Sequence, residues 1–242
     1  MTVKAILVIG AGGGIGKALV SHFAHVYPSA TVYAVSRSHL DFSQANVIQS
    51  TLNTDVDADI LTWLKSLKGI QFDLVIGAMG LLHGEYNGTP VMPEKKLEDI
   101  NTTQLQAYFH INTIVPSIWI KHLVKYMNIQ KSIVCFLSAR VGSIEDNRMG
   151  GWYGYRASKA ALNMIMKTAS IEYRRRTKHT AFVSYHPGTV DSDLSKPFQA
   201  NVKPEKLFTA EYTAARLCTI LTEINVEEGP YFLDWDNKPV SW

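Results

Sequence analysis

Cysteine is scarce in this chain of 242 residues, which contains only Cys135 and Cys218. Their wide separation fits neither a disulfide framework nor the paired spacing of a metal or redox site. The eight histidines show no metal-ligand spacing either, and His186, which precedes Pro187, is interpreted as a turn residue. We therefore expect a reduced, cytoplasmic protein with no bound metal.

Strong charge and long hydrophobic runs are also missing. The net charge of +3 is too small to predict a nucleic-acid partner. The apolar runs are too short to span a membrane, and the N-terminal one lacks a signal-peptide cleavage site. With 46% hydrophobic and 19% charged residues, the composition is that of an ordinary globular protein. We expect neither a nucleic acid nor a membrane among its partners.

Short apolar runs alternate with longer segments of helical periodicity. Strands are expected at 5–10, 31–36, 72–80, 132–139, 180–188 and 229–235, and helices at 15–27, 57–67, 103–127, 153–176 and 209–224. Because the strands are apolar on both faces, they predict a parallel sheet covered by helices on both sides. Right-handed crossovers then give a doubly wound, Rossmann-type α/β fold in a single domain, 1–242, with ligands at the carboxyl ends of the strands.

A glycine-rich segment, GAGGGIG, follows the first expected strand and opens the first expected helix. Gly10, Gly14 and Gly16 give the spacing G-x-x-x-G-x-G, with Ile15 between the last two. Such glycines permit a tight turn and let a pyrophosphate approach the backbone at the helix N-terminus. The segment predicts dinucleotide binding, and a plain glycine-rich turn is the alternative.

The end of the second expected strand indicates which dinucleotide. An acidic residue there would bind the ribose hydroxyls of NAD, but the chain has none until Asp41. It has Ser36 and Arg37 instead, and a guanidinium beside a hydroxyl suits a 2′-phosphate. We therefore expect NADP(H). The alternative is that Arg37 is a surface side chain without a ligand.

Tyr155 and Lys159 share one face of the expected helix 153–176, because residues four apart on a helix are neighbours. A phenol holds its proton up to a pH of about 10, and a neighbouring ammonium would lower that pKa. The phenol could then exchange a proton near neutral pH beside a nicotinamide, which supplies hydride. The spacing alone could arise by chance, so the interpretation depends on the glycine-rich segment.

Three motifs, GAGGGIG, YGYRASKAALN and HPGTV, resemble in order and separation those of the short-chain dehydrogenase/reductase family. The segment SARVGSIEDN followed by GGWYGYRASKAALN resembles the branch that contains carbonyl reductases and bacterial C-factor-like signalling proteins. The resemblance covers essentially residues 3–242. It implies an NADP(H)-dependent oxidoreductase that acts on a small-molecule carbonyl or secondary alcohol.

The resemblance also implies residue roles. Tyr155 would be the general acid/base, Lys159 would hold the nicotinamide ribose, and Asn112 would help hold a water in the proton relay, unless it only bends its helix. Further cofactor contacts are implied at Asn53, Ala78, Gly80, Ser138, Pro187, Gly188, Thr189 and Val190.

The family commonly forms dimers or tetramers through the two helices expected at 103–127 and 153–176. We accordingly expect a homodimer or homotetramer, and apolar residues on several sides of these helices could form the interface: Ile118, Trp119, Leu162, Ile165 and Met166. Residues 191–208, which mix prolines with apolar residues, are expected to form a substrate lid.

One departure from the family concerns the reaction itself. Ala139 stands where the family has a serine that holds the substrate oxygen. Ser138 precedes it but faces the other way on a strand, and Ser143 lies further along the loop. Either serine, or neither, could take this role. A second interpretation is therefore an NADP-binding regulatory or cell-signalling protein with little or no turnover.

Overall fold

The computed structural model describes residues 3–242 and contains a seven-stranded sheet of order β11-β8-β7-β4-β1-β2-β3. Neighbouring strands in this sheet are all parallel. The strands are β1 (Ala5–Ile9), β2 (Thr31–Ser36), β3 (Val47–Thr51), β4 (Leu74–Gly77), β7 (Ser132–Leu137), β8 (Thr180–His186) and β11 (Tyr231–Asp234). The predicted doubly wound α/β fold is confirmed.

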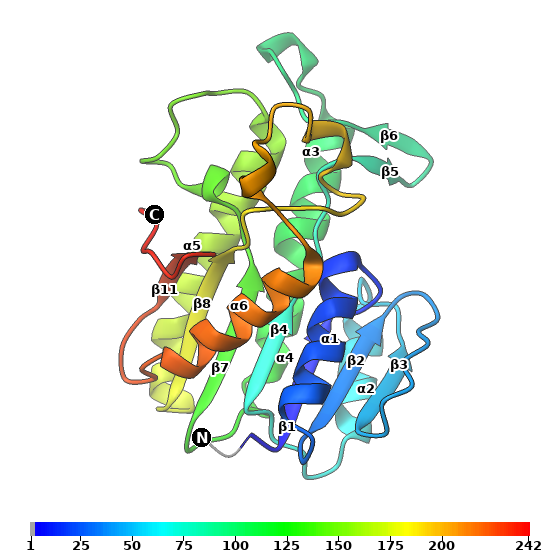
Figure 1. Cartoon of the computed structure of the whole chain (residues 1–242), viewed down its shortest axis with the longest axis vertical. Coiled ribbons are helices and arrows are strands. Elements are labelled where there is room, and N and C mark those ends of the chain that lie inside the picture. Colours follow the sequence, from blue (N-terminus) through cyan, green and yellow to red (C-terminus); the bar gives the residue numbers. More distant parts are fainter. Residues whose placement is uncertain (1–2) are drawn as a thin grey trace.

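Helices cover both faces of the sheet, with α1 and α6 in front of it in Figure 1 and α2, α4 and α5 behind it. The helices are α1 (Gly14–Val26), α2 (Asp57–Ser66), α3 (Thr102–Phe109), α4 (Val115–Leu123), α5 (Tyr153–Arg176) and α6 (Ala210–Glu223). Phe23 and Leu217 belong to the front core, and Trp119 and Met166 to the back core; all four are fully buried. Full burial of side chains of this size stabilises a fold by about 1.5–3 kcal/mol each.

The chain reverses its direction of travel across the sheet between β1 and β4. From β1 it moves outward to β2 and β3, and it then crosses to β4 and continues through β7, β8 and β11. The loops at the carboxyl ends of β1 and β4 therefore diverge, and such a point is where sheets of this kind bind ligands. In Figure 1 these carboxyl ends point upward, toward α3 and the loops around it.

The segment predicted as helical at 103–127 is helical from Thr102 to Leu123, but it is not one regular α-helix. The segment forms α3, then one turn of π-helix (His110–Ile114), and then α4. Pro116 lies in the first turn of α4 and has no N–H to donate, while the Val115 N–H reaches back five residues to the His110 carbonyl. The wider turn holds Asn112, and π-turns of this kind often occur at functional sites.

Several short strands were not predicted. The edge strand β3 is only partly buried, so it lacks the continuous apolar pattern that marks the inner strands. A small hairpin, β5 (Gly84–Tyr86) with β6 (Thr89–Val91), projects at the upper right of Figure 1. Two further short strands, β9 (Thr189–Val190) and β10 (Leu207–Phe208), pair in parallel above the main sheet.

Candidate active site

The glycine-rich segment forms a tight turn from the end of β1 into α1. Gly10 has a φ of +84°, a conformation that residues with a side chain rarely adopt. Gly13 caps α1 without a side-chain hydrogen bond, and the first turn of this helix carries no acidic residue. The helix N-terminus therefore presents free N–H groups and a positive dipole end to the cleft, as an anionic phosphate requires.

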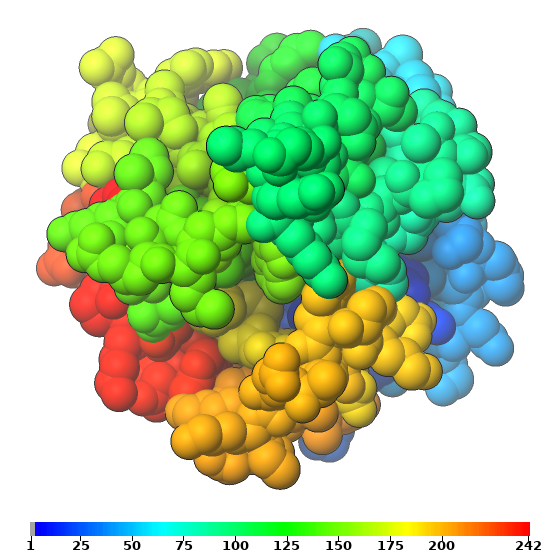
Figure 2. All heavy atoms as spheres, turned by 90° about the horizontal axis from the view of Figure 1, so that it is seen from above, coloured from blue at the N-terminus to red at the C-terminus, as the bar shows by residue number. Residues whose placement is uncertain are grey.

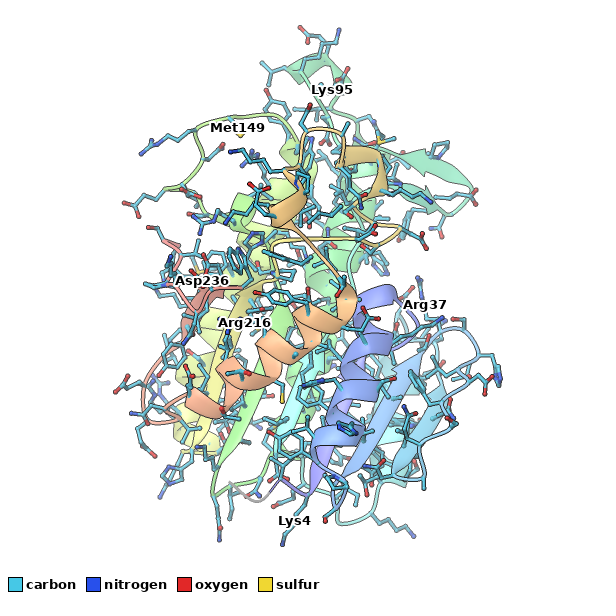
Figure 3. All side chains as sticks on the ribbon, viewed as in Figure 1. Lys4, Arg37, Lys95, Met149, Arg216 and Asp236 are labelled. Atoms are coloured by element: carbon cyan, nitrogen blue, oxygen red, sulfur yellow. The ribbon has the colours of Figure 1, made fainter. Side chains whose placement is uncertain are left out.

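Arg37 lies at the carboxyl edge of the sheet, directly after β2, whereas Lys4, just before β1, lies at the opposite edge of the sheet (Figure 3). Its guanidinium is well exposed and makes an ion pair of 3.2 Å with Asp55. Both residues line a cavity together with Gly10, Ser36 and Ala78. Asn53 does not line this cavity: its side-chain carbonyl accepts the Asp55 N–H, and Thr54 and Asp55 form the wall instead.

Tyr155 lies in the first turn of α5 and is almost completely buried. Its ring makes edge-to-face contacts with Tyr108 and Trp152, each with a centroid separation of 6.1 Å. The Lys159 Nζ lies 5.9 Å from the centre of the Tyr155 ring and donates a hydrogen bond of 2.8 Å to the Leu137 carbonyl. The predicted pair is therefore brought together, at the carboxyl end of β7.

The lowered tyrosine pKa that the sequence predicts is not found in this structure. Burial raises the pKa of Tyr155 above its ordinary value, because desolvation disfavours the phenolate. Burial likewise lowers the pKa of Lys159 to about 8, because desolvation disfavours its ammonium. The lysine donates to a backbone carbonyl rather than to the phenol, and the buried phenol keeps its proton throughout the neutral range.

The lowered pKa of Lys159 predicts a measurable pH dependence of stability. Between its folded pKa of about 8 and its ordinary value of 10.5, the unfolded chain binds a proton that the folded chain does not. The contribution of Lys159 to the free energy of unfolding is therefore largest at high pH and declines as the pH falls toward 8. Urea unfolding at several pH values between these limits gives the slope of the free energy of unfolding against pH. This slope should be smaller in Lys159→Met than in the parent protein, and the difference is the contribution of Lys159.

Lys167→Met changes a lysine on the exposed part of α5 and serves as the control, which should keep the slope of the parent. A slope in Lys159→Met equal to that of the parent would contradict the assignment of this pH dependence to Lys159.

Asn112 is fully buried and fixes the chain that follows β4. Its side-chain carbonyl accepts the Leu81 N–H at 2.8 Å, and its amide nitrogen donates to the Leu81 carbonyl and to Ser158 Oγ. A methyl group placed on Gly80 would lie 3.6 Å from Lys159 Nζ and 3.7 Å from Asn112 Oδ1. Asn112 and Lys159 therefore both lie close to Gly80, which lines the cleft, and Asn112 lies behind this wall.

The end of β7 carries no free hydroxyl toward Tyr155. Ala139 lines the cavity in which Tyr155 lies. Ser138 also lines it, but its Oγ donates to Asn163 Oδ1 at 2.7 Å. Ser143 is buried in the following loop, accepts the Asp146 N–H and lines a separate cavity without Tyr155.

The HPGTV segment leaves β8 and enters the same cleft. Pro187, Gly188, Thr189 and Val190 line the cavity beside Tyr155, and Ile15 and Ser192 face them. The following residues, 191–208, form two short 3₁₀ turns, Lys196–Phe198 and Pro204–Lys206. This segment spans the top of the cleft, where Figure 2 shows a hollow between the orange segment and the green segments opposite.

Three adjoining cavities share walls and form one cleft. The Arg37 cavity shares Gly13 and Gly80 with a middle cavity that Lys159 also lines, and the middle cavity shares Ile15 and Tyr155 with a third. Of the predicted site residues, all but Asn53, Asn112 and Gly16 line this cleft. No three His, Cys, Asp or Glu side chains gather as a metal site would require within residues 3–242, and no helix in that range could cross a membrane.

The sequence model of the family described as short chain dehydrogenase matches residues 4–203. This match spans most of the chain, including the glycine-rich segment, Tyr155 and Lys159. The chain belongs to the short-chain dehydrogenase family. Its members are oxidoreductases, so the chain is an oxidoreductase of this family.

Individual relatives of this short-chain dehydrogenase are distant. A 1-hydroxy-2-glutathionyl-2-methyl-3-butene dehydrogenase of Rhodococcus sp. is 26% identical over 244 residues, covering 99% of this chain and all of the relative. C-signal of Myxococcus xanthus is 30% identical over 109 residues, covering 45% of this chain and 60% of C-signal. The NADPH-bound carbonyl reductase from chicken fatty liver superposes with a TM-score of 0.82 over the whole of both chains at 22% identity, which shows a shared fold.

Glu94, which sequence reasoning missed, and Trp152, whose expected role was apolar packing, hold the start of α5 in this short-chain dehydrogenase. Glu94 is buried, its Oε2 accepts the Gly154 N–H, and its backbone carbonyl accepts the Trp152 N–H. Trp152 adopts a left-handed conformation with φ of +54° and packs against Tyr155. A carboxylate at a helix N-terminus is stabilising, but Glu94 is distant in sequence, so no local signal marks it as the cap.

Proposed function

We propose that this short-chain dehydrogenase transfers hydride between NADP(H) and a carbonyl or secondary alcohol, with Tyr155 as the general acid/base. The observation that carries the proposal is that Tyr155 and Lys159 line one cavity with Gly13 and Gly14 of the glycine-rich segment. A dinucleotide whose pyrophosphate lies at the N-terminus of α1 would therefore have room to extend to the phenol. Neither the Tyr155–Lys159 pair nor the glycine-rich segment would support this function without the other.

The chain's own residues fit the cofactor. The N-terminus of α1 would offer its N–H groups to the pyrophosphate, Lys159 would bind the nicotinamide ribose, and the 187–190 segment, which lines the cavity beside Tyr155, would contact the nicotinamide. Arg37 and Ser36 border the cavity where a 2′-phosphate would bind. The bound cofactor supplies the hydride, and the NADPH-bound chicken carbonyl reductase of the same fold supports this choice.

Arg37→Ala should reduce the preference for NADPH over NADH by about 10-fold or more, because a charge-assisted hydrogen bond contributes about 1.5–3 kcal/mol. Dissociation constants for both cofactors, measured by fluorescence titration, test this. Asp55→Asn removes the carboxylate that pairs with Arg37 and should shift the preference in the opposite direction, toward NADPH. An unchanged ratio in Arg37→Ala would mean that Arg37 is a surface residue without a cofactor role.

The phenol of Tyr155 is protonated, and this is the form that donates a proton when a carbonyl is reduced. Because burial raises the pKa of Tyr155, its hydroxyl carries a proton at neutral pH and can deliver it to the carbonyl oxygen. The ring is held between Tyr108 and Trp152, which restricts the position of the hydroxyl. Lys159 lies on the cleft side of the same helix, where its ammonium would favour the phenolate that remains after proton transfer.

The substrate cavity is mainly apolar. Leu82, Val141, Trp152, Leu194 and Phe198 line it beside Tyr155, and its volume is about 300 Å³. We propose that residues 191–208 act as a lid over this cavity. Phe198, which belongs to this segment, packs against Trp152 with a distance of 5.0 Å between the two ring centroids. A ketone with an aromatic or branched apolar arm suits these walls, and a strongly charged substrate does not.

The direct test is the oxidation of NADPH by the purified protein, followed by the loss of its nicotinamide absorbance. A panel of aryl ketones, aldehydes and quinones should contain substrates that the protein reduces, while matched carboxylates should be inert. Absence of turnover with every class of carbonyl, in a protein that binds NADPH, would refute the enzymatic proposal.

A second candidate function is an NADP-binding regulator with little or no turnover. The observation that favours it is Ala139, which places no polar atom where the reaction needs a hydrogen-bond donor. Loss of one such donor lowers turnover by about 10²–10³-fold. Tight NADPH binding without reduction of any carbonyl in the panel would favour this function.

We also propose a homodimer or homotetramer, but through a different set of residues from the one the sequence suggested. Trp119, Leu162 and Met166 are buried in the core of the single chain and cannot form an interface. The apolar side chains that α5 does expose are Met164 and Ile171. Size-exclusion chromatography with light scattering at micromolar concentration should give at least twice the mass of one chain, and Met164→Glu should lower it. A monomer in the parent protein would refute this proposal.

A further inference from the structure

The reaction proposed above places negative charge on the substrate oxygen, and Tyr155 is one donor to it. A second donor in such sites stabilises the transition state and is worth about 10²–10³ in turnover. Ala139 cannot supply one. Ser138 uses its only hydrogen in the bond to Asn163, and Ser143 faces another cavity. A donor for this position has to come from another element.

His186 is the last residue of β8 and lines the same cavity as Ala139, Trp152 and Tyr155. The strands β7 and β8 are paired here, with the Ser138 N–H donating to the Tyr185 carbonyl, so the two strand ends form one continuous wall. His186 therefore ends β8 at the same edge of the sheet where β7 ends, and Ala139 lies two residues beyond the end of β7.

The ring of His186 has no hydrogen-bond partner in the part of the chain that the structure describes. Its Nδ1 is shielded from solvent and unpaired. The residue as a whole remains partly exposed, and Nε2 is not among the shielded atoms, which leaves Nε2 on the accessible side. A buried polar atom without a partner is uncommon, and here it means that no protein group binds the ring and fixes which nitrogen carries its proton.

The charged groups around this ring are Arg140, Asp146 and Asp234. The two carboxylates are engaged with Arg140, at 2.8 Å for Asp234 and 3.5 Å for Asp146, and neither binds the imidazole. Burial and the nearby Arg140 charge lower the pKa of His186 to about 4. At neutral pH the ring is therefore uncharged and carries one N–H, and a neutral imidazole of this kind can polarise a carbonyl.

We propose that His186 is a catalytic residue whose Nε2–H donates a hydrogen bond to the substrate carbonyl oxygen, in place of the hydroxyl that Ala139 lacks. The inference rests on the proposed oxidoreductase function. The carbonyl carbon gains the hydride that NADPH supplies, the oxygen gains the Tyr155 proton, and the C=O double bond becomes a C–OH single bond. NADPH is oxidised to NADP⁺, and His186 keeps its own proton throughout.

A double-mutant cycle between His186→Ala and Ala139→Ser tests the proposal. His186→Ala should lower kcat by about 10²–10³-fold, while the dissociation constant for NADPH stays at that of the parent. Ala139→Ser restores a hydroxyl at the end of β7, so it should raise kcat at least about tenfold more in the His186→Ala background than in the parent. His186→Gln keeps an N–H donor and should retain more turnover than His186→Ala.

Three results would overturn it: a kcat of His186→Ala equal to that of the parent, an equal effect of Ala139→Ser in both backgrounds, or a loss of NADPH binding in His186→Ala that accounts for its lost turnover. If His186→Ala does not fold, the comparison of His186→Gln with and without Ala139→Ser decides the same point.

A binding measurement separates failure of this inference from failure of the proposed function. Acetophenone, an aryl ketone that suits the apolar walls, is titrated into the NADP⁺ complex, which cannot transfer hydride, and tryptophan fluorescence reports binding. Loss of a neutral hydrogen bond weakens binding by about 2–10-fold. Weaker binding in His186→Ala supports the donor role even if the parent reduces no ketone, and equal binding contradicts it.

Discussion

Tyr155→Phe is expected to lower turnover by about 10²–10⁴-fold while leaving NADPH affinity at the level of the parent protein. The substitution removes the phenolic oxygen alone, because the ring packs against Tyr108 and Trp152 and phenylalanine keeps those contacts. The hydroxyl has no hydrogen-bond partner within residues 3–242, so its loss leaves no orphaned group and stability should not fall. Steady-state kinetics, NADPH titration and thermal unfolding of the same preparation measure the three quantities.

Tyr153→Phe is the matched control, since Tyr153 begins the same helix but lines the separate cavity that contains Ser143. It should retain the kcat of the parent. The assignment of Tyr155 as the general acid/base would be wrong if Tyr155→Phe reduced the same ketones at the parent's rate.

Gly16→Ala should lower both stability and cofactor affinity. A methyl group built on Gly16 would lie 2.1 Å from the Gly10 carbonyl oxygen and 3.0 Å from the Ala11 Cα, and backbone atoms cannot move aside as a flexible side chain can. Overpacking of this kind typically destabilises a protein by about 1–3 kcal/mol. For a chain of this size each kcal/mol lowers the melting temperature by about 2–4 °C. The N–H groups at the start of α1 would also be displaced, which weakens NADPH binding.

Gly13→Ala provides the control for stability, because a methyl group on Gly13 would meet nothing closer than 3.6 Å. Differential scanning calorimetry of the protein without cofactor should show a lowered melting temperature for Gly16→Ala and not for Gly13→Ala. Equal melting temperatures in the two variants would mean that the turn between β1 and α1 relaxes more easily than its geometry indicates.

The central sheet and its helices could be predicted because they follow strong, local patterns. Inner strands such as β2 are continuous apolar runs, and α5 has unbroken helical periodicity. The π-turn at Asn112 escaped prediction because its sequence has the same apolar periodicity as a regular helix. The hairpin of β5 and β6 did carry a signal, the dipeptide Asn87-Gly88, in which both residues have positive φ as a tight hairpin turn requires.

The candidate site could be predicted only as far as its residues lie in recognisable segments. Tyr155, Lys159 and the glycine-rich segment are such cases. Glu94 and His186 are not, because their importance arises from which distant elements pack against them. The pKa of Tyr155 escaped prediction for a related reason: it depends on burial in the folded chain, and sequence spacing reports only the neighbouring charge.

The pairing of β9 with β10 has a consequence for how such a protein could acquire new specificity. The Asp191 N–H donates to the Phe208 carbonyl, so the residues between them form an insert whose two ends lie side by side. Replacing that insert with one of different length or composition would leave the strands and the glycine turn in place and would change the cavity walls, including the contact between Phe198 and Trp152. Grafted inserts from other proteins of this architecture would be a direct route to altered substrate choice.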